Sequence, residues 1–300
     1  MGQIADPTID QTRKEDSRLG RRMIAPAAIV TAALVIYPLA LGFKTSLQSG
    51  GATFGNEVRW VGLRNYADVL KTSKAFDAAV HSLEYVAMAV VLEIILGLGV
   101  AVVLHRVFRG RGVVLAILIL PWALPSVVSG LLWRRVFDPD SGLLNAVLLR
   151  IHLIKEPHVW LAGEASARGF VTLVHVWGVL PLVSLIFVAA LQSIPDEVYS
   201  ASAVDGATPI RQFRYITLPL LRPAIAVALT VGTVLSIGIF DEIYVLNGTA
   251  LNTRSVLMQV YNTTFVDADF AHGTALAFML AGVTACIGGI SVLFLRRSAT

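Results

Sequence analysis

The most constraining feature of this chain is a set of six long apolar blocks separated by polar segments. A helix needs about 20 consecutive apolar residues to cross the roughly 30 Å hydrocarbon core of a bilayer. Each block reaches that length, and its apolar residues follow one another without the period of 2 or 3.6 that one-sided burial produces. The blocks are residues 23–43, 83–104, 113–132, 169–191, 223–245 and 274–295. We therefore predict an all-α integral membrane protein with six transmembrane helices.

The composition supports a membrane protein and argues against other classes. The 300 residues are 56% hydrophobic and only 15% charged, whereas soluble domains carry about 25% charged residues. The net charge of +4 comes from basic residues that flank the apolar blocks and form no long run, which favours membrane topology over nucleic-acid binding. The first block is too long for a signal peptide, so we expect an uncleaved helix. Cys286 is the single cysteine, and no Cys/His spacing predicts a metal site.

The distribution of lysine and arginine predicts that both chain ends are cytoplasmic. If the N-terminal tail is inside, the cytoplasmic segments hold 13 of the 24 basic residues within 66 positions, and the external segments hold 11 within 102. Cytoplasmic loops are enriched in these residues. The prediction is a cytoplasmic tail at 1–22 and a membrane domain at 23–300. The external segments lie at about 44–82, 133–168 and 246–272, and the longest internal cytoplasmic segment lies at about 192–222.

The cytoplasmic segment 192–222 carries helix start and stop signals. Ser193, with Asp196 three residues later, predicts a capped helix start, and Gly206 supplies a left-handed stop. Thr208 and Pro209 then predict the start of a second helix. Two short helices tied directly to two membrane helices would suit a lever. A single amphipathic helix on the membrane surface is the alternative.

Polar and aromatic residues within the spans are candidates for a solute path, because ionisable groups there usually face a cavity or a partner. Carboxylate and amide groups would bind hydroxyls, and aromatic faces would stack. The candidates are Glu93, Trp122, Trp177, Asp241, Glu242, Tyr244 and Asn247. His175 lies beside Trp177 in the fourth block. The tryptophans could instead serve packing, the two carboxylates an exposed helix end, and Glu93 an interhelical hydrogen bond. No lysine or arginine lies deep in a span, which favours a neutral saccharide over a strongly anionic solute.

One stretch carries a family resemblance. It reads Ile194-Pro-Asp-Glu-Val-Tyr-Ser-Ala-Ser-Ala-Val-Asp-Gly-Ala-Thr-Pro-Ile-Arg-Gln-Phe-Arg-Tyr-Ile-Thr-Leu-Pro219. It resembles the EAA loop of binding-protein-dependent ABC importer permeases, in the sugar branch related to the maltose-transporter permeases. Further matching stretches are residues 60–66, 120–125 and 240–244. The matching loop residues are Tyr199, Ala201, Asp205, Gly206, Ala207, Phe213, Ile216, Leu218 and Pro219. The family's signature glutamate falls at Ser200.

The resemblance implies the type I ABC importer permease fold in a bacterial or archaeal plasma membrane. It implies a second permease chain, two ATPase subunits and an extracytoplasmic solute-binding protein as partners, with membrane lipid around them and no nucleic acid. Segment 192–222 then becomes the coupling loop, and its ATPase-coupling residues are Tyr199, Ser200, Ala201, Asp205, Gly206, Ala207 and Phe213. No phosphate-loop motif is present, so we expect ATP and Mg²⁺ in the ATPase subunits and neither a cofactor nor an enzymatic activity in this chain.

Two other classes of membrane protein fit the sequence less well. An ion-coupled secondary transporter of a small polar solute often shows inverted repeats with broken helices. The two halves of this chain show no convincing repeat, and Pro121, Pro125 and Pro181 do not fall in matching positions. A membrane-embedded enzyme would need clustered histidines or carboxylates, but the six histidines are scattered. The lead prediction is a permease subunit of a sugar or polyol importer.

Overall fold

The computed structural model describes residues 7–49, 58–106, 108–248 and 253–298. Parts of the predicted tail 1–22 and of the predicted external segments 44–82 and 246–272 lie outside these ranges. The described chain is mainly helical, with one short antiparallel pair, β1 (Gln48–Ser49) and β2 (Arg59–Trp60). The helices are α1 (Pro7–Ser46), α2 (Arg64–Lys71), α3 (Ser73–His105), α4 (Arg111–Ala123), α5 (Ser126–Val136), α6 (Leu143–Arg150), α7 (Glu164–Gln192), α8 (Asp196–Val204), α9 (Pro209–Gln212), the π-helix η1 (Phe213–Thr217), α10 (Leu218–Leu220), α11 (Arg222–Ile237), α12 (Asp241–Leu246), α13 (Val256–Tyr261), the π-helix η2 (Asn262–Val266) and α14 (Phe270–Ser298).

The helices confirm the predicted all-α membrane fold. Four are long and apolar enough to cross a membrane unbroken: α3, α7, the Arg22–Ser46 part of α1 and the Phe270–Leu293 part of α14. They correspond to the first, second, fourth and sixth apolar blocks. Two strongly bent helix pairs, α4 with α5 and Pro209–Leu220 with α11, could each form one further span. Counting each pair as one span gives six spans.

The third block, 113–132, is not the single continuous helix that was predicted. It divides into α4 and α5, which meet at an angle of 103°. Leu124 between them is extended, with φ −84° and ψ 137°. The ring of Pro125 disfavours helical backbone in the residue before it and removes one N–H donor, so the helix ends there.

The fifth block, 223–245, is also interrupted, contrary to the prediction. Helix α11 ends at Ile237, and α12 begins only at Asp241. The 16 residues of α11 span about 24 Å, which is shorter than the hydrocarbon core. At its other end, α11 is bent by 65° from the run Pro209–Leu220. The hydroxyl of Ser255 donates to the carbonyl of Ile239 at 2.6 Å, which satisfies one backbone group exposed by the break.

Segment 192–222 forms the predicted pair of short helices, α8 and α9, with Gly206 between them at φ +77°. The predicted Ser193 cap is wrong. Pro195 occupies the N-cap position of α8, and the Ser193 hydroxyl donates to the carbonyl of Ala190 at 2.8 Å. Pro195 has φ −62° and ψ 139°, which is extended backbone, and α8 starts directly after it. Thr208 and Pro209 begin α9 as predicted, without a side-chain capping bond.

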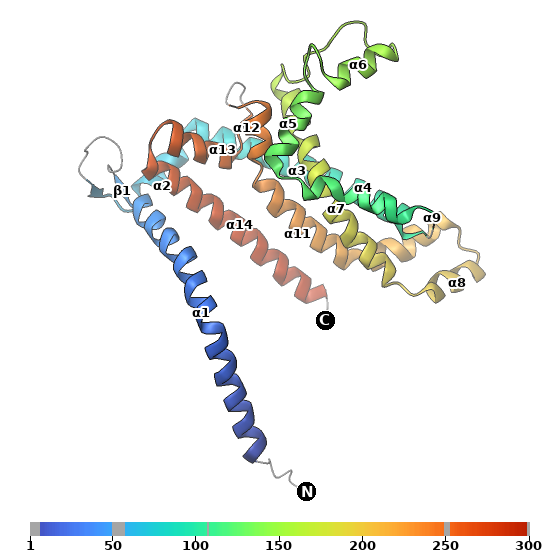
Figure 1. Ribbon diagram of the computed structural model, residues 1–300, viewed down its shortest axis with the longest axis horizontal. Helices are drawn as coiled ribbons and strands as arrows, with labels where there is room; N and C mark the ends of the chain where they lie inside the picture. The colour runs from blue at the N-terminus through green and yellow to red at the C-terminus, as the bar shows by residue number, and fades with distance from the viewer. Residues whose placement is uncertain (1–6, 50–57, 107, 249–252, 299–300) are drawn as a thin grey trace.

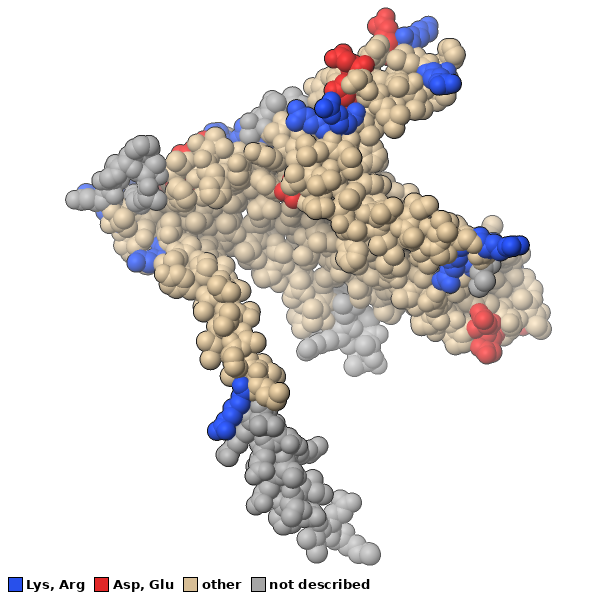
Figure 2. All heavy atoms as spheres, in the orientation of Figure 1, with Lys and Arg blue, Asp and Glu red and all other residues tan. Residues whose placement is uncertain are grey.

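The elements sort into two ends. In Figure 1, α2, α6, α12 and α13 lie toward the top of the view, and α8, the start of α1 and the end of α14 lie below them. Figure 2 shows the charged side chains of this face gathered mainly near α6 and near α8 and α9, with a largely uncharged surface between them. An uncharged band between charged ends is the surface that a bilayer requires.

Two apolar clusters stabilise the helix bundle, and α7 contributes to both. The cluster nearer α8 includes Leu104, Phe187 and Leu221, all at most 1% exposed. The other cluster includes Tyr85 and Ile243. Helix α7 packs most extensively against α3. This contact is close because Gly97 leaves no side chain between the two helices.

The predicted external segment 133–168 folds as an arm around one buried amide. Asn145, in α6, is 3% exposed. Its nitrogen donates to the carbonyls of Pro139 and His158, both at 2.9 Å, and its oxygen accepts from the indole of Trp160 at 2.9 Å. In the preceding turn, the amide and hydroxyl of Ser141 hold the pKa of the Asp138 carboxyl below its ordinary value. The arm is therefore an ordered structure.

We predict that Gly97→Leu destabilises the protein, whereas Gly99→Leu does not. A Cβ added at Gly97 would lie 2.7 Å from a methyl carbon of Val183, and one at Gly99 would meet nothing within 4 Å. Overpacking of this kind costs roughly 1–3 kcal/mol. Thermal unfolding of the purified protein in detergent, followed by size-exclusion chromatography, measures the difference. Equal melting temperatures for the two variants would contradict the close α3–α7 contact.

Candidate functional site

Both helix breaks open onto one cavity. It has a volume of about 320 Å³ and lies between the α4–α5 bend, the α11–α12 break and the middle of α7. Three of the predicted solute-path residues line it: Trp122, Asp241 and Glu242. The other lining residues are Pro121, Leu124, Ser126, Ser129, Val174, His175, Gly178, Val179, Leu235 and Gly238. The cavity therefore combines hydroxyl, imidazole and carboxylate groups with an aromatic side chain.

The breaks place two helix starts opposite each other. Ser126 begins α5 and Asp241 begins α12, and the Ser126 hydroxyl donates to the Asp241 carboxylate. Asp241 and Glu242 stand in the first turn of α12, where the helix dipole favours negative charge. The interruption that the sequence did not predict is thus what aims these two carboxylates at the cavity.

A buried polar network stands behind the cavity wall. His175 Nδ1 lies 3.1 Å from Glu242 Oε1, and His175 Nε2 lies 3.3 Å from the hydroxyl of Ser236. Glu93 Oε1 lies 3.7 Å from the same Nε2. All four residues are buried, although they come from α3, α7, α11 and α12. Along α7, His175 lies between Val174 of one apolar cluster and Val179 of the other, so the network forms a polar layer between the two clusters.

The other predicted solute-path residues lie elsewhere. Tyr244 and Asn247 line a second cavity of about 520 Å³ together with Arg134, whose Nη1 donates to the carbonyl of Val245 at 3.4 Å. Trp177 packs edge-on against Trp133, with ring centroids 5.6 Å apart. Glu93 does not line the first cavity and contacts it only through His175. The predicted set therefore divides into four locations.

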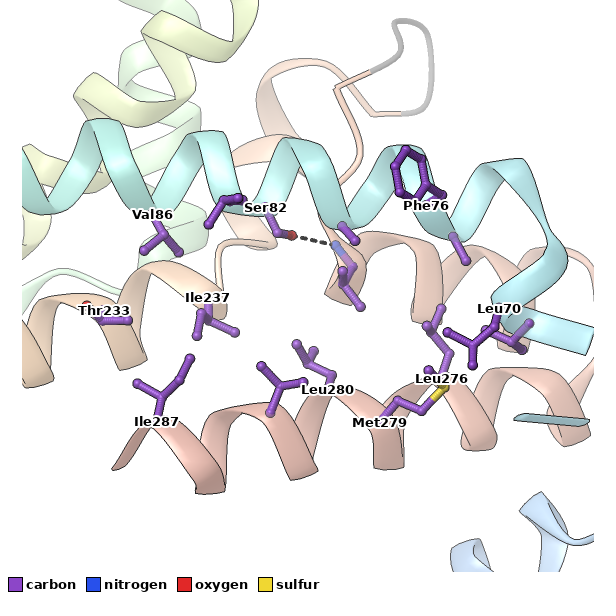
Figure 3. Close-up of a pocket in the computed structure, with 16 residues that line it drawn as sticks. Leu70, Phe76, Ser82, Val86, Thr233, Ile237, Leu276, Met279, Leu280 and Ile287 are labelled. Carbon is purple, nitrogen blue, oxygen red and sulfur yellow. Dashed lines mark hydrogen bonds between the residues drawn. The ribbon is translucent and has the colours of Figure 1, made fainter. Parts of the chain in front are cut away.

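A third hollow, of about 420 Å³, has an almost wholly apolar wall (Figure 3). It lies between α3, α11 and α14, and its wall includes Phe76, Val86 and Leu280. Its Ser82 hydroxyl already accepts the backbone N–H of Val256 at 2.8 Å. A polyhydroxylated solute would lose its hydrogen bonds with water there and gain almost none. The polar cavity is the better candidate for such a solute.

Segment 192–222, the predicted coupling loop, folds as a hairpin of α8, α9 and η1 that side-chain hydrogen bonds hold together; we call it the coupling hairpin. The hydroxyls of Tyr199 and Thr217 lie 3.1 Å apart, joining α8 to the end of η1. Gln212 Nε2 donates to the Tyr199 carbonyl at 3.2 Å and to the Ser202 hydroxyl at 2.9 Å. Tyr199 also packs against the apolar cluster nearer α8. These contacts fix the hairpin to the bundle.

The predicted coupling residues divide between the hydrogen bonds that hold this hairpin together and its surface. Tyr199 takes part in these hydrogen bonds. Ser200, Ala201, Asp205, Gly206 and Phe213 are exposed, and Ala207 is half-buried. The Ser200 hydroxyl donates to the carbonyl of Asp196 at 3.0 Å, within its own helix. The structure thus brings the seven residues together on one hairpin.

Sequence reasoning missed the polar partners of the carboxylates. Neither Ser126 nor Ser236 was predicted as a site residue, and His175 was predicted without a role. A histidine inside an apolar block is itself a signal of a buried functional group. Among the described residues, no three His, Cys, Asp or Glu side chains are placed to hold a metal ion.

The comparisons with known proteins agree on one family. The family described as "Binding-protein-dependent transport system inner membrane component" matches residues 93–299. The trehalose transport system permease protein SugA of Mycobacterium tuberculosis is 31% identical over 285 residues, covering 95% of this chain and 90% of that protein. The trehalose/maltose transport system permease protein MalF of Thermococcus litoralis is 34% identical over 266 residues, covering 88% and 89%.

A solved structure shares the fold. It is a bacterial ABC transporter involved in the import of the acidic polysaccharide alginate, and one of its chains superposes with a TM-score of 0.81 at 21% identity. The match covers 97% of this chain and 99% of that chain. These comparisons confirm the predicted family resemblance and the type I importer permease fold, and they do not favour the secondary-transporter alternative.

We predict that Gln212→Leu loosens the coupling hairpin and that Gln192→Leu does not. The Gln212 amide makes both hydrogen bonds between α9 and α8, whereas Gln192 is exposed and makes no side-chain hydrogen bond. Hydrogen–deuterium exchange of the purified protein should show faster exchange over residues 196–207 in the first variant alone. Unchanged exchange there would mean that the hairpin is held by other contacts.

Proposed function

The chain belongs to the family of binding-protein-dependent transport system inner membrane components, and from this we propose that it is the membrane-spanning subunit of an ATP-driven importer of a sugar or related polyol. It is a multi-pass membrane protein. The observation that carries the sugar assignment is the cavity at the two helix breaks. Carboxylates, hydroxyls and an indole line it, and lysine and arginine do not. Such a wall accepts hydrogen bonds from sugar hydroxyls and offers no cation to an anionic solute.

Two of the relatives support a neutral saccharide as solute. The names of SugA and MalF refer to trehalose transport and to trehalose or maltose transport, and this chain matches each relative over most of its length. Trp122, which is 54% exposed, offers an aromatic face at the cavity edge. Asp241 and Glu242 offer acceptor oxygens beside it. Tyr244 and Asn247, in the second cavity, belong to the same path in this proposal.

The proposed machine contains partners on both sides of the membrane. A second permease chain completes the path, two ATPase subunits hold ATP and Mg²⁺, and an extracytoplasmic binding protein delivers the solute. The coupling hairpin contacts an ATPase subunit, with Ile210 (80% exposed) and Phe213 as its exposed apolar edge. Apolar residues exposed on a polar cytoplasmic element favour a protein contact over free solvent. The tail and the C-terminus are cytoplasmic in this assignment.

The test is uptake by the whole system. The chain is co-expressed with the sister permease, ATPase and binding protein of its own genome in cells that cannot otherwise import trehalose or maltose. Uptake of radiolabelled trehalose or maltose should depend on every component. Uptake that persists without the ATPase subunits would refute an ATP-driven importer and support an ion-coupled transporter. A system that assembles but imports neither sugar would refute trehalose and maltose as its solutes.

We predict that Asp241→Asn lowers the uptake rate about tenfold without affecting complex assembly. The substitution removes the negative charge that accepts the Ser126 hydroxyl and faces the cavity. The expected loss is roughly that of one charge-assisted hydrogen bond. Asp77→Asn is the matched control, because Asp77 is exposed at the outer end of α3 and lines no cavity described above. Uptake and co-purification of the ATPase are measured for both variants. Normal uptake in the Asp241 variant would remove this carboxylate from the path.

We predict that Gly206→Val impairs coupling and that Gly112→Val is tolerated. Gly206 has φ +77°, a conformation that costs a residue with a side chain about 1–2 kcal/mol, whereas Gly112 lies in a helix with open space around it. Distortion of the hairpin should reduce ATPase co-purification and lower sugar uptake roughly tenfold. Full retention of both in the Gly206 variant would show that the turn does not matter for the ATPase contact.

A further inference from the structure

Glu93 is an ionisable side chain buried in a membrane helix, and it lies one layer behind the proposed solute cavity. It is 1% exposed and does not line the cavity. Its carboxylate faces His175 and Ser236, but neither oxygen is in a hydrogen bond of ordinary geometry. A carboxylate is costly in such a place, so its position requires a reason.

The carboxylate occupies the space that a side chain at residue 232 would need, and residue 232 is glycine. A Cβ added at Gly232 would lie 2.3 Å from Glu93 Oε2, well inside van der Waals contact. Helix α11 therefore approaches α3 with the carboxylate inserted between them. Any side chain at 232 would push the carboxylate away from His175 or separate the two helices.

The network transmits the position of this carboxylate to the cavity. Glu242 lies near one ring nitrogen of His175, at 3.1 Å, and Ser236 and Glu93 lie near the other. A ring held at both nitrogens cannot swing about its Cβ–Cγ bond. His175 and Glu242 both line the cavity, and the titratable side chains that meet there are these two, Glu93 behind them and Asp241 beside them.

We propose that Glu93 is a positioning residue: lodged against Gly232, its carboxylate holds the His175 imidazole, and through it Glu242, at the wall of the solute cavity. This inference rests on the proposed importer function, and it assigns Glu93 a role behind the solute path in place of direct solute contact. A mispositioned cavity should allow ATP hydrolysis to run without delivering solute.

The experiment measures the ratio of ATP hydrolysed to trehalose imported. The complete complex is reconstituted in proteoliposomes with its binding protein and trehalose as the probe. This ratio does not depend on how much complex is folded, so a purely structural loss of protein leaves it unchanged. Glu93→Met fills the same space without polar atoms and should raise the ratio about tenfold. Glu93→Gln keeps the shape and a hydrogen-bonding oxygen and should stay within about threefold of the wild type.

Gly232 supplies an independent arm of the experiment. Gly232→Ala should raise the ratio as much as Glu93→Met does, whereas the matched control Gly99→Ala, which faces open space in α3, should not. In a Glu93→Ala background the added methyl group meets no carboxylate, so Gly232→Ala should have no further effect. A wild-type ratio in Glu93→Met, or full additivity of the Gly232 and Glu93 substitutions, would overturn the proposal.

A second measurement keeps this inference separate from the proposed function. The wild type, Gly232→Ala, Glu93→Ala and the double variant form a double-mutant cycle. Their melting temperatures are compared by thermal unfolding, which needs no solute. Non-additive melting temperatures would support the Gly232–Glu93 contact, and additive ones would overturn it. A wild-type complex that imports no trehalose would count against the proposed function alone, and the thermal cycle would then decide on the Glu93 contact.

Discussion

The structure depends on one constraint: in hydrocarbon, every backbone polar group must find a partner within the protein. A membrane helix can therefore be interrupted only where other protein groups or a cavity take over its hydrogen bonds. The chain meets this condition at both breaks. At the α11–α12 break, the Ser255 hydroxyl donates to the carbonyl of Ile239, and its oxygen accepts the N–H of Met258 at 3.1 Å. At the α4–α5 break, the N–H of Leu124 donates to the carbonyl of Pro121 at 3.2 Å, and the N–H of Ser129 donates to the carbonyl of Pro125 at 3.0 Å. The polar cavity lies between the two breaks, and the Ser126–Asp241 pair on its wall joins them.

The unbroken helices could be predicted from the sequence because hydropathy depends on composition alone. Blocks 83–104 and 169–191 fall within α3 and α7. The breaks could not be predicted in the same way, because one proline or glycine barely changes the mean hydropathy of a 20-residue block. Pro125 gave a local signal, since the residue before a proline avoids helical backbone. Gly238 gave a weaker one, because glycine inside a membrane helix is common.

The candidate site was predictable only in part, because residue type identifies a candidate side chain but not the cavity that it reaches. Residue type singled out Asp241, Glu242 and Trp122, and the structure brings them to one cavity. Type alone could not separate them from Tyr244 and Asn247, because the turn of α12 directs these residues to a different cavity. The His175 network depends on contacts between residues more than 60 positions apart, which no local pattern encodes.

The polar network also lies where motion of the coupling hairpin would reach the cavity. Helix α7 carries His175 and continues into the hairpin, about 26 Å away at 1.5 Å per residue. Helix α11 leaves the hairpin and carries Gly232 and Ser236. Glu93 stands on α3, which is not joined to the hairpin, and packing fixes α3 against α7. A displacement of the hairpin that shifts α11 against the α3–α7 pair would therefore move Ser236 and Gly232 relative to Glu93 and His175. The network is thus placed to change its contacts when the hairpin moves, and the proposed import cycle needs such a link between ATPase and solute.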